Sequence, residues 1–474
     1  MLGLFGTLNL AQRSLQNQQQ GIEVTGHNLA NVNNPAYARQ HIVLQTSSTL
    51  DTPLGPQGTG ANVVAIQQLR SVILDTQLQG EISVTGFLDA SQQALQYAQT
   101  DLGQQIDRRA MGAEGASAAQ GVGGQHAIAE GLSDLFNAFQ SLSTSPTSLT
   151  ERQLLMTKAQ TLAGQFNQVD DRLNRLSSAL DDSIQTDLSA ANKFINSIAK
   201  LNDQIIKAEL RTAGSANDLR DTRQEQIEGL AKLVDIQTAS SANGGMDVSI
   251  GRVSFISGGK TLDTLEAYDA GGGQVLVRAQ TAQTSLSLTG GSVQGNIETR
   301  DGTISNLRSN LNSLASVLIT EINQVHRAGF GLDDSTGANF FTGTTAADIK
   351  VNDALLANPA SVQASGVAGT AGDNQIALTL GQLADKKHAA LNNQTFSQNY
   401  GQTVAALGES LASTNSKLSD QNLVENLLQR QRDSISGVSL DEEMTELMKF
   451  QKTYQASARL ITTVDEMLDT VINM

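Results

Sequence analysis

The chain has no cysteine and no tryptophan, and only five of its 474 residues are proline. The lack of cysteine excludes disulfide bonds, zinc–thiolate sites and cysteine nucleophiles. Aromatic residues make up only 4% of the chain, so its cores must be built mainly from leucine, isoleucine, valine and alanine, as they are in packed helices and coiled coils. Because proline is so scarce, long helices are permitted over most of the chain.

Surplus positive charge and long apolar runs are missing too. The formal net charge of −16 argues against nucleic acid or an anionic membrane surface as a partner, because both are bound by surplus Lys and Arg. No run approaches the roughly 18 to 20 apolar residues that a membrane span needs, so we expect no membrane insertion. The first basic residue is Arg13, so no positively charged region of a secretory signal peptide precedes an apolar stretch.

Motifs of enzymes and metal sites are equally scarce. There is no HExxH and no GxSxG motif, and acidic pairs such as Asp170-Asp171 are interpreted as solvated helix faces. Residues 254–261 (SFISGGKT) approach a P-loop, but Ser254 replaces its first glycine and Leu262 begins a run that favours a strand over a helix, so we interpret them as a glycine turn. None of the five histidines is spaced as a metal ligand on one helical face: His27, His41, His126, His326 and His388. We therefore expect no enzyme, no cofactor and no metal.

The clearest pattern that is present is a heptad repeat near the start of the chain. Apolar or small residues recur at steps of four and three, at Leu4, Leu8, Ala11, Leu15, Gln18, Ile22, Thr25, Leu29 and Val32. The pattern stops at Asn33-Asn34-Pro35, where proline disfavours the α conformation of the residue before it. It predicts an amphipathic helix of about 28 residues.

A second heptad repeat closes the chain. Ser439 and Glu442 are spaced as a capping box and predict a helix start. The repeat then runs through Leu440, Met444, Leu447, Gln451, Tyr454, Ala458, Ile461, Asp465, Leu468 and Ile472, with Phe450 and Val464 flanking its two most polar positions. Chain ends usually fray, whereas these ends carry some of the strongest periodicity in the protein. Most heptad seams are intramolecular core, but the position of these two favours helices that are ordered by neighbouring subunits.

The interior of the chain has two kinds of pattern. Helical seams cover residues 155–205, as one helix of more than about 50 residues, and also 304–325 and 400–418, which predicts a bundle. Between them, β-prone runs such as 253–256 (VSFI) and 274–277 (QVLV) alternate with glycine pairs, which predicts an inserted β domain. Glycine-rich stretches near 112–124 and 366–372 predict surface loops.

We therefore predict a mainly α fold with an inserted β domain. The molecule should be an elongated multi-domain rod, a long α-helical bundle or coiled coil, with its N- and C-terminal helices paired at one pole. The predicted divisions are the N-terminal helix of a paired terminal domain at 1–45, the first part of a helical bundle at 46–234, a β-rich outer domain at 235–299, the second part of the bundle at 300–429 and the C-terminal helix of the terminal domain at 430–474.

Residues 26–40 (GHNLANVNNPAYARQ) resemble the N-terminal signature of the axial proteins of the bacterial flagellum, which include rod, hook and hook-associated proteins. Three C-terminal runs resemble the other end of the same superfamily: 436–443 (SGVSLDEE), 454–459 (YQASAR) and 465–470 (DEMLDT). Between them, 331–333 (GLD), 340–343 (FFTG) and 349–352 (IKVN) are similar to the hook-associated protein 1 family, whose members form the first junction between hook and filament.

The resemblance implies a structural subunit, exported unfolded through the flagellar type III channel to a secreted, extracellular position on the flagellum. Its partners would be further copies of itself in a ring or helical assembly, the flagellar hook protein, a neighbouring hook-associated protein and a cytoplasmic export chaperone on the C-terminal helix. The residues expected to contact other subunits or the chaperone are Leu4, Leu8, Leu15, Ile22, Leu29, Asn31, Asn34, Pro35, Tyr37, Leu440, Met444, Leu447, Phe450, Tyr454, Ile461 and Leu468. The alternatives are another axial protein, such as a hook subunit or the third hook-associated protein, and an exported cell-wall hydrolase.

Overall fold

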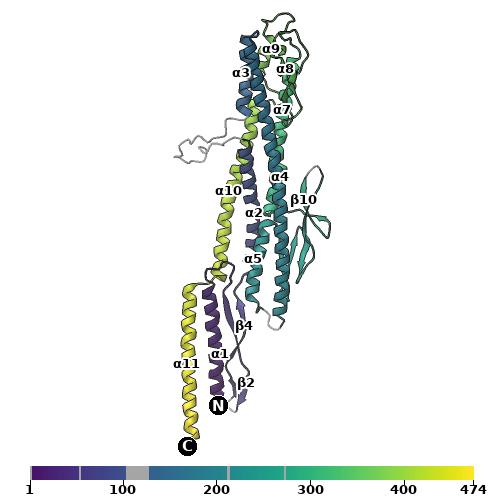
Figure 1. The fold of residues 1–474 in the computed structure, drawn as a ribbon. Helices are drawn as coiled ribbons and strands as arrows, with labels where there is room; N and C mark the ends of the chain where they lie inside the picture. Colours follow the sequence, from purple (N-terminus) through teal and green to yellow (C-terminus); the bar gives the residue numbers. More distant parts are fainter. Residues whose placement is uncertain (1–2, 53–54, 103–127, 211–213, 272–273, 474) are drawn as a thin grey trace.

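The computed structural model describes residues 3–52, 55–102, 128–210, 214–271 and 274–473. The molecule is elongated, with both ends of the chain at one pole and the helical bundle extending away from them (Figure 1). At that pole the terminal helices α1 (Leu4–Ala30) and α11 (Leu440–Ile472) lie side by side. The predicted fold, mainly α with paired terminal helices and an inserted β region, is confirmed.

The bundle is built around one very long helix, α4. It has 60 residues and confirms the prediction of a helix longer than 50. Its N-terminus is capped by Ser148, whose hydroxyl accepts a hydrogen bond from the backbone N–H of Glu151. The helices of the bundle are α2 (Val72–Asp101), α3 (Ile128–Thr144), α4 (Leu149–Ala208), α5 (Asn217–Leu233), α6 (Gly291–Glu298), α7 (Ser305–His326) and α10 (Phe396–Ser436).

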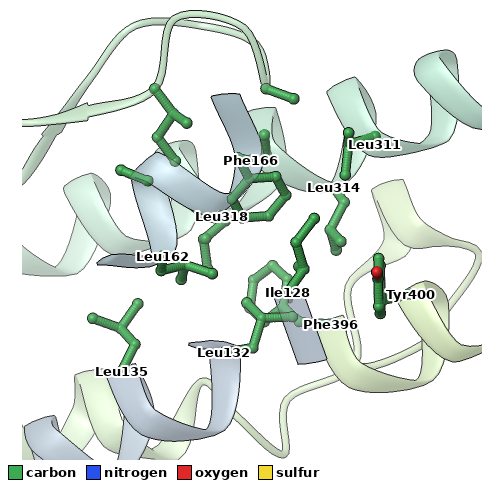
Figure 2. Close-up of a cluster of buried hydrophobic side chains, with 14 of the residues drawn as sticks. Ile128, Leu132, Leu135, Leu162, Phe166, Leu311, Leu314, Leu318, Phe396 and Tyr400 are labelled. Atoms are coloured by element: carbon green, nitrogen blue, oxygen red, sulfur yellow. The ribbon is translucent and has the colours of Figure 1, made fainter. Parts of the chain in front are cut away.

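Two hydrophobic cores lie along α4. The first, far from the termini, joins the N-terminal half of α4 to α3, α7 and the start of α10. Figure 2 shows Leu162 and Phe166 of α4 directed towards Ile128, Leu318 and Phe396 in this core. The second core joins the C-terminal half of α4 to α5, α6 and the β region. One continuous helix therefore holds both halves of the bundle in a fixed relation.

The inserted β region consists of two small antiparallel sheets on the side of the bundle (Figure 1). One has the strand order β5-β6-β7-β8 and the other β11-β10-β9. Their strands are β5 (Gln237–Ser240), β6 (Met246–Ile250), β7 (Val253–Ser257), β8 (Lys260–Thr261), β9 (Leu265–Asp269), β10 (Val275–Ala279) and β11 (Thr284–Ser285). The predicted β-prone runs fall on β7 and β10.

The prediction that the β region reaches residue 299 is wrong at its end. Residues 291–298 form α6, which continues through a π-helical turn (Thr299–Ile304) into α7. The predicted glycine turn at 290–291 lies at the start of this helix. Gly291 has a φ of +80°, and a Cβ there would lie 2.3 Å from the carbonyl oxygen of Leu233, so this position requires glycine. Val293 and Ile297 are buried, so packing against the bundle explains the helix.

A second correction concerns the residues just after α1, which were expected to belong to the helical bundle from residue 46. They form two antiparallel pairs, β1 (Gln40–Thr46) with β4 (Ala61–Gln68) and β2 (Thr49–Thr52) with β3 (Gly55–Gly58). This hairpin lies along α1 (Figure 1). Asn17 on α1 donates a hydrogen bond to the carbonyl of Ala61, 2.7 Å away. The start of β4 is thus hydrogen-bonded to α1. Helical periodicity cannot predict such a contact between separate segments of the chain.

The pole opposite the termini carries short elements between α7 and α10 (Figure 1). They are β12 (Phe341–Thr342), β13 (Lys350–Val351), α8 (Asp353–Ala357), the 3-10 turn η3 (Pro359–Ser361), α9 (Gln375–Gln382) and the 3-10 turn η4 (Ala389–Leu391). The predicted loop at 366–372 contains no helix or strand, whereas the one at 112–124 lies outside the described residues. Among the described residues, no helix combines the length and apolar character needed to cross a bilayer.

Candidate assembly interface

The terminal pair is an antiparallel coil with a strict heptad register. Three contacts, each seven residues apart on both helices, define it: Ser14 with Ser457, Gly21 with Phe450 and Asn28 with Glu443. The two serine hydroxyls are 2.8 Å apart, and the side-chain N–H of Asn28 donates to Glu443 Oε2 at 3.0 Å. Knob-and-hole packing between antiparallel heptads produces such a repeat. The pairing of the ends predicted from the sequence is therefore made within one chain.

The face that α1 presents to α11 is not the leucine stripe of the heptad prediction. The residues that α1 buries are small or polar for the most part: Ala11, Gly21, Val24, Thr25 and Asn28. Small side chains let the two backbones approach closely, so Phe450 of α11 fits above Gly21. The large predicted residues of α1 are all only half-buried: Leu4, Leu8, Leu15, Ile22 and Leu29.

On α11 the predicted residues divide into two groups. Leu447, Phe450, Ile461 and Leu468 are half-buried, and Phe450 packs against Gly21 of α1. The others, Leu440, Met444 and Tyr454, are 52%, 42% and 40% exposed. Three described residues of α11 are buried, Glu443, Ser457 and Val464, and the heptad prediction missed the first two. Val464 was identified beside the predicted repeat, whereas Glu443 and Ser457 are polar residues that an apolar repeat cannot identify.

Asn28 is the centre of the joint between the coil and the rest of the molecule. Its side chain is 2% exposed and makes four hydrogen bonds. The amide N–H₂ donates to Gln40 O at 2.8 Å and to Glu443 Oε2 at 3.0 Å. The amide oxygen accepts from the Tyr37 hydroxyl at 2.8 Å and from the Gln40 backbone N–H at 2.9 Å. One asparagine therefore ties α1 to α11, to the following turn and to β1, with its donors and acceptors all used.

The signature residues after α1 form the turn that Asn28 holds. Asn34 accepts from the backbone N–H of Ala36, and the side chain of Asn31 donates to His27 O. Tyr37 is buried, and burial together with nearby carboxylates raises the pKa of its hydroxyl above its ordinary value. Pro35 is exposed on this turn. The structure thus places Tyr37 inside the joint, while Asn34 and Pro35 face outward.

An ionic network fastens this turn to the bundle. Arg70 contacts Asp221 at 2.9 Å and Asp75 at 3.3 Å, and the Asp221 carboxylate accepts from the backbone N–H of Ala38 at 3.3 Å. Burial raises the pKa of Asp221 to about 6, although Arg70 acts in the opposite direction. Sequence reasoning missed these residues because Arg70 lies just before α2, Asp75 on α2 and Asp221 on α5, all outside the signature.

The break between α10 and α11 is also held by the turn. The backbone N–H of Arg39 donates to Ser436 O at 2.8 Å, and its guanidinium contacts Glu442 and Glu443, each at 2.6 Å. Ser439 is the N-cap residue of α11, as predicted, but its side chain makes no capping hydrogen bond. The predicted capping box is therefore wrong, and Glu442 pairs with Arg39 instead.

Two family models match the chain. The model of the flagellar hook-associated protein FlgK helical domain matches residues 121–341, and that of the flagellar basal body rod FlgEFG protein C-terminal matches residues 429–474. Over 100% of its length the chain is 27% identical to flagellar hook-associated protein 1 of Bacillus subtilis (strain 168), of which it covers 99%. The protein of the same name from Escherichia coli (strain K12) is 22% identical, with 98% and 99% of the two chains covered. These full-length matches support the recognition of the chain as a relative of flagellar hook-associated protein 1.

A solved structure agrees with these matches at the level of the fold. The flagellar hook junction protein FlgK from Burkholderia pseudomallei is 14% identical and superposes with a TM-score of 0.62, covering 76% of this chain and 100% of that chain. The C-terminal family model begins inside α10 and spans the whole of α11. It therefore includes Glu443 and Phe450, two of the residues that fix the coil.

The chemical motifs weighed in the sequence form no metal site in the described residues. The stretch that approached a P-loop is the hairpin of β7 and β8, with Ser257 opposite Lys260, which confirms the interpretation as a glycine turn. The strand returns at Lys260, two residues earlier than expected. No group of three or more His, Asp or Glu in the described part of the chain could hold a metal ion. His27 contacts Tyr37 and His326 is buried against Phe340, whereas His126 lies outside the described residues.

Proposed function

We propose that this chain is a structural subunit of the bacterial flagellum that forms the junction between hook and filament and polymerises through α1 and α11 after type III export. The names of its relatives support the place in the flagellum. The proposal includes further copies of the chain, the hook protein, a neighbouring hook-associated protein and an export chaperone as partners. It includes an extracellular location and no enzymatic activity.

The observation that carries polymerisation is the apolar surface that α11 leaves uncovered. Leu440 and Met448 near its start are 52% and 55% exposed, and Leu460, Met467 and Val471 further on are 44%, 53% and 61% exposed. These side chains lie outside the seam with α1. Five large apolar side chains exposed on one terminal helix favour contact of that helix with other subunits.

Five of the sixteen predicted interaction residues, all on α11, take two roles in this proposal. Leu440, Met444 and Tyr454 are exposed and would contact neighbouring subunits directly. Leu447 and Phe450 face α1 and would hold α11 in place for that contact. An export chaperone that binds Phe450 must act before α1 packs, because α1 covers this side chain in the folded chain.

The test is to place charge at two exposed apolar positions of α11. In the double variant Met448→Glu, Leu460→Glu, we expect cells to lose their filaments and to release filament protein into the medium. Because both side chains are exposed, the melting temperature of the purified variant should stay within about 2 °C of the parent. The matched control is Gln451→Glu, an exposed polar position on the same helix.

Normal filaments on cells that carry the doubly charged variant would contradict the proposal. A deletion of residues 439–474 gives the same test more severely, since it removes the whole of α11. Immunogold labelling separates this function from that of a hook subunit, which would decorate the entire hook. A peptidoglycan-digestion assay with the purified chain tests the hydrolase alternative, which none of the matching proteins favours.

A further inference from the structure

The exposed methionines of the described residues all lie on α11. The chain has eight methionines and no cysteine, so its sulfur chemistry is that of the thioether alone. Met156 is 3% exposed in the first core, and Met246 is half-buried on β6. On α11, by contrast, Met444, Met448 and Met467 are 42%, 55% and 53% exposed. A mild oxidant would therefore reach these three before the other described methionines, because oxidation follows exposure.

Each of these methionines belongs to an exposed apolar stripe along α11. Residues spaced by four, or by seven and then four, return to the same side of a helix. Two such sets are exposed, and every member of them is between 42% and 61% exposed. The stripes are Leu440, Met444 and Met448 near the start of the helix, and Leu460, Met467 and Val471 near its end. The proposed function places these side chains against neighbouring subunits.

The pairing of α11 with α1 leaves Met448 uncovered. Glu443 and Phe450 are the neighbouring residues of α11 that contact α1, through Asn28 and Gly21. With 3.6 residues per turn, Met448 lies about 140° around the helix from Glu443 and about 160° from Phe450. Its side chain therefore points away from α1. Formation of the coil does not shield this sulfur atom, whereas contact with another subunit would.

Oxidation changes what an apolar stripe can contact. Hydrogen peroxide transfers one oxygen atom to the thioether sulfur, and the products are methionine sulfoxide and water. A sulfur lone pair forms the new S–O bond while the O–O bond of the peroxide breaks, so sulfur is oxidised and the peroxide is reduced. The apolar side chain becomes polar. Burial of a polar oxygen without a hydrogen-bond donor is unfavourable, so the sulfoxide weakens any contact that covers the stripe.

We infer that Met444, Met448 and Met467 form a redox-sensitive modification site: peroxide oxidises them in the free chain, and the sulfoxides keep that chain out of the assembly. The inference rests on the proposed function and adds to it a chemical condition on the surface of α11. The site is open only before assembly, because the contacts that join subunits would bury the stripes. Reduction of the sulfoxide restores the thioether, so the effect is reversible.

The experiment measures how the purified full chain binds to hooks isolated from cells that lack it. One sample is treated with dilute hydrogen peroxide, which catalase then removes, and the other is left untreated. We expect mass spectrometry to find the added oxygen first on Met444, Met448 and Met467. The amount of chain that sediments with the hooks should then fall about ten-fold. Incubation with methionine sulfoxide reductases that act on both sulfoxide epimers should restore it.

Two variants serve as matched controls. In the triple variant Met444→Leu, Met448→Leu, Met467→Leu the stripes stay apolar and change little in volume. This variant should bind hooks like the parent and should keep that binding after peroxide treatment. In Met246→Leu the sites on α11 are intact, so peroxide should still abolish binding. The melting temperature of the oxidised parent should stay within about 2 °C of the untreated chain, because the three side chains are exposed.

The outcomes separate the inference from the proposed function. If the untreated parent does not bind hooks, both are contradicted. If it binds, and binds equally well after all three methionines of α11 are oxidised, only the inference is overturned. Oxidation that begins at Met156 or Met246 overturns it too, and so does an equal loss of binding in the triple leucine variant, because the damage would then lie outside α11.

Discussion

The ring of Phe450 on α11 occupies the space where any residue other than glycine at position 21 of α1 would place its Cβ. A Cβ built on Gly21 lies 2.6 Å from Cε1 of that ring, far inside ordinary contact distance. Glycine within a helix normally costs about 1 kcal/mol relative to alanine, so a packing reason is needed for it. Here the closest approach of the two terminal helices supplies that reason.

Gly21→Ala should destabilise the coil in spite of the higher helix propensity of alanine. We expect a net loss of about 1 to 2 kcal/mol in the free energy of unfolding of the coil, because overpacking costs about 1 to 3 kcal/mol. Hydrogen exchange of α1 and α11 measures it. Gly26→Ala is the matched control, since nothing lies within 4 Å of a Cβ there, and it should stabilise α1. Slower exchange in both variants would show that Phe450 moves aside freely.

Asn28→Ala should loosen the joint between the coil and the bundle. The substitution removes the four hydrogen bonds that Asn28 makes to the Tyr37 hydroxyl, the Glu443 carboxylate and the backbone of Gln40, and the loss of one hydrogen bond costs about 1 kcal/mol. We expect a loss of at least about 2 kcal/mol in urea unfolding followed by circular dichroism. Asn33→Ala, at an exposed position of the same turn, serves as the control. Equal stability of the two variants would contradict the proposal that Asn28 stabilises the joint between the coil and the bundle.

Stability should depend on pH through Asp221. Burial raises its pKa from 3.8 to about 6 in the folded chain. Between these values the folded state binds more protons than the unfolded state, so the contribution of this carboxyl to the free energy of unfolding falls as pH rises from about 4 to 6 and is constant above. In Asp221→Asn this slope should disappear. The unfolding free energy of parent minus variant should therefore decrease over that window; an increase would contradict the assignment.

Asp348 should show the opposite sign. Its carboxylate accepts backbone hydrogen bonds from Thr344 at 2.9 Å and Thr345 at 2.6 Å, and these bonds lower its pKa to about 2. Its stabilising contribution is present above about pH 4 and is lost as pH falls through about 2. Relative to Asp348→Asn, the parent should be more stable at pH 5 and should lose that advantage at pH 2 in thermal unfolding.

In the isolated monomer, α11 should be the first helix cut by protease. It packs mainly on α1, and its surface carries Lys449, Lys452 and Arg459, all exposed. By contrast, α4 is buried along both cores. Local opening is easiest where few apolar contacts must break. We expect the first tryptic product to end within α11, as judged by intact mass. Initial cleavage inside α4 would contradict this expectation.

Much of the architecture follows from local pattern alone. The heptad repeats place α1, α4, α7 and α11 within a few residues of their observed bounds, because a helix buries one stripe whatever its partner is. Glycine pairs between β-prone runs likewise located the hairpins of the β region. The strands β1 to β4 were missed, although alternating residues such as those of 61–68 (ANVVAIQQ) and nearby glycines carry the strand signal.

The sequence by itself determined that both ends are long amphipathic helices, that a β region interrupts the bundle, and that the chain resembles flagellar axial proteins. Only the tertiary structure decided which side of α1 meets α11, because the sequence does not show that the ring of Phe450 packs against Gly21. It also decided that Asn28 bonds to Glu443, 415 positions away. Periodicity reports how residues are spaced along one helix, whereas a polar contact between distant segments depends on where the whole chain carries them.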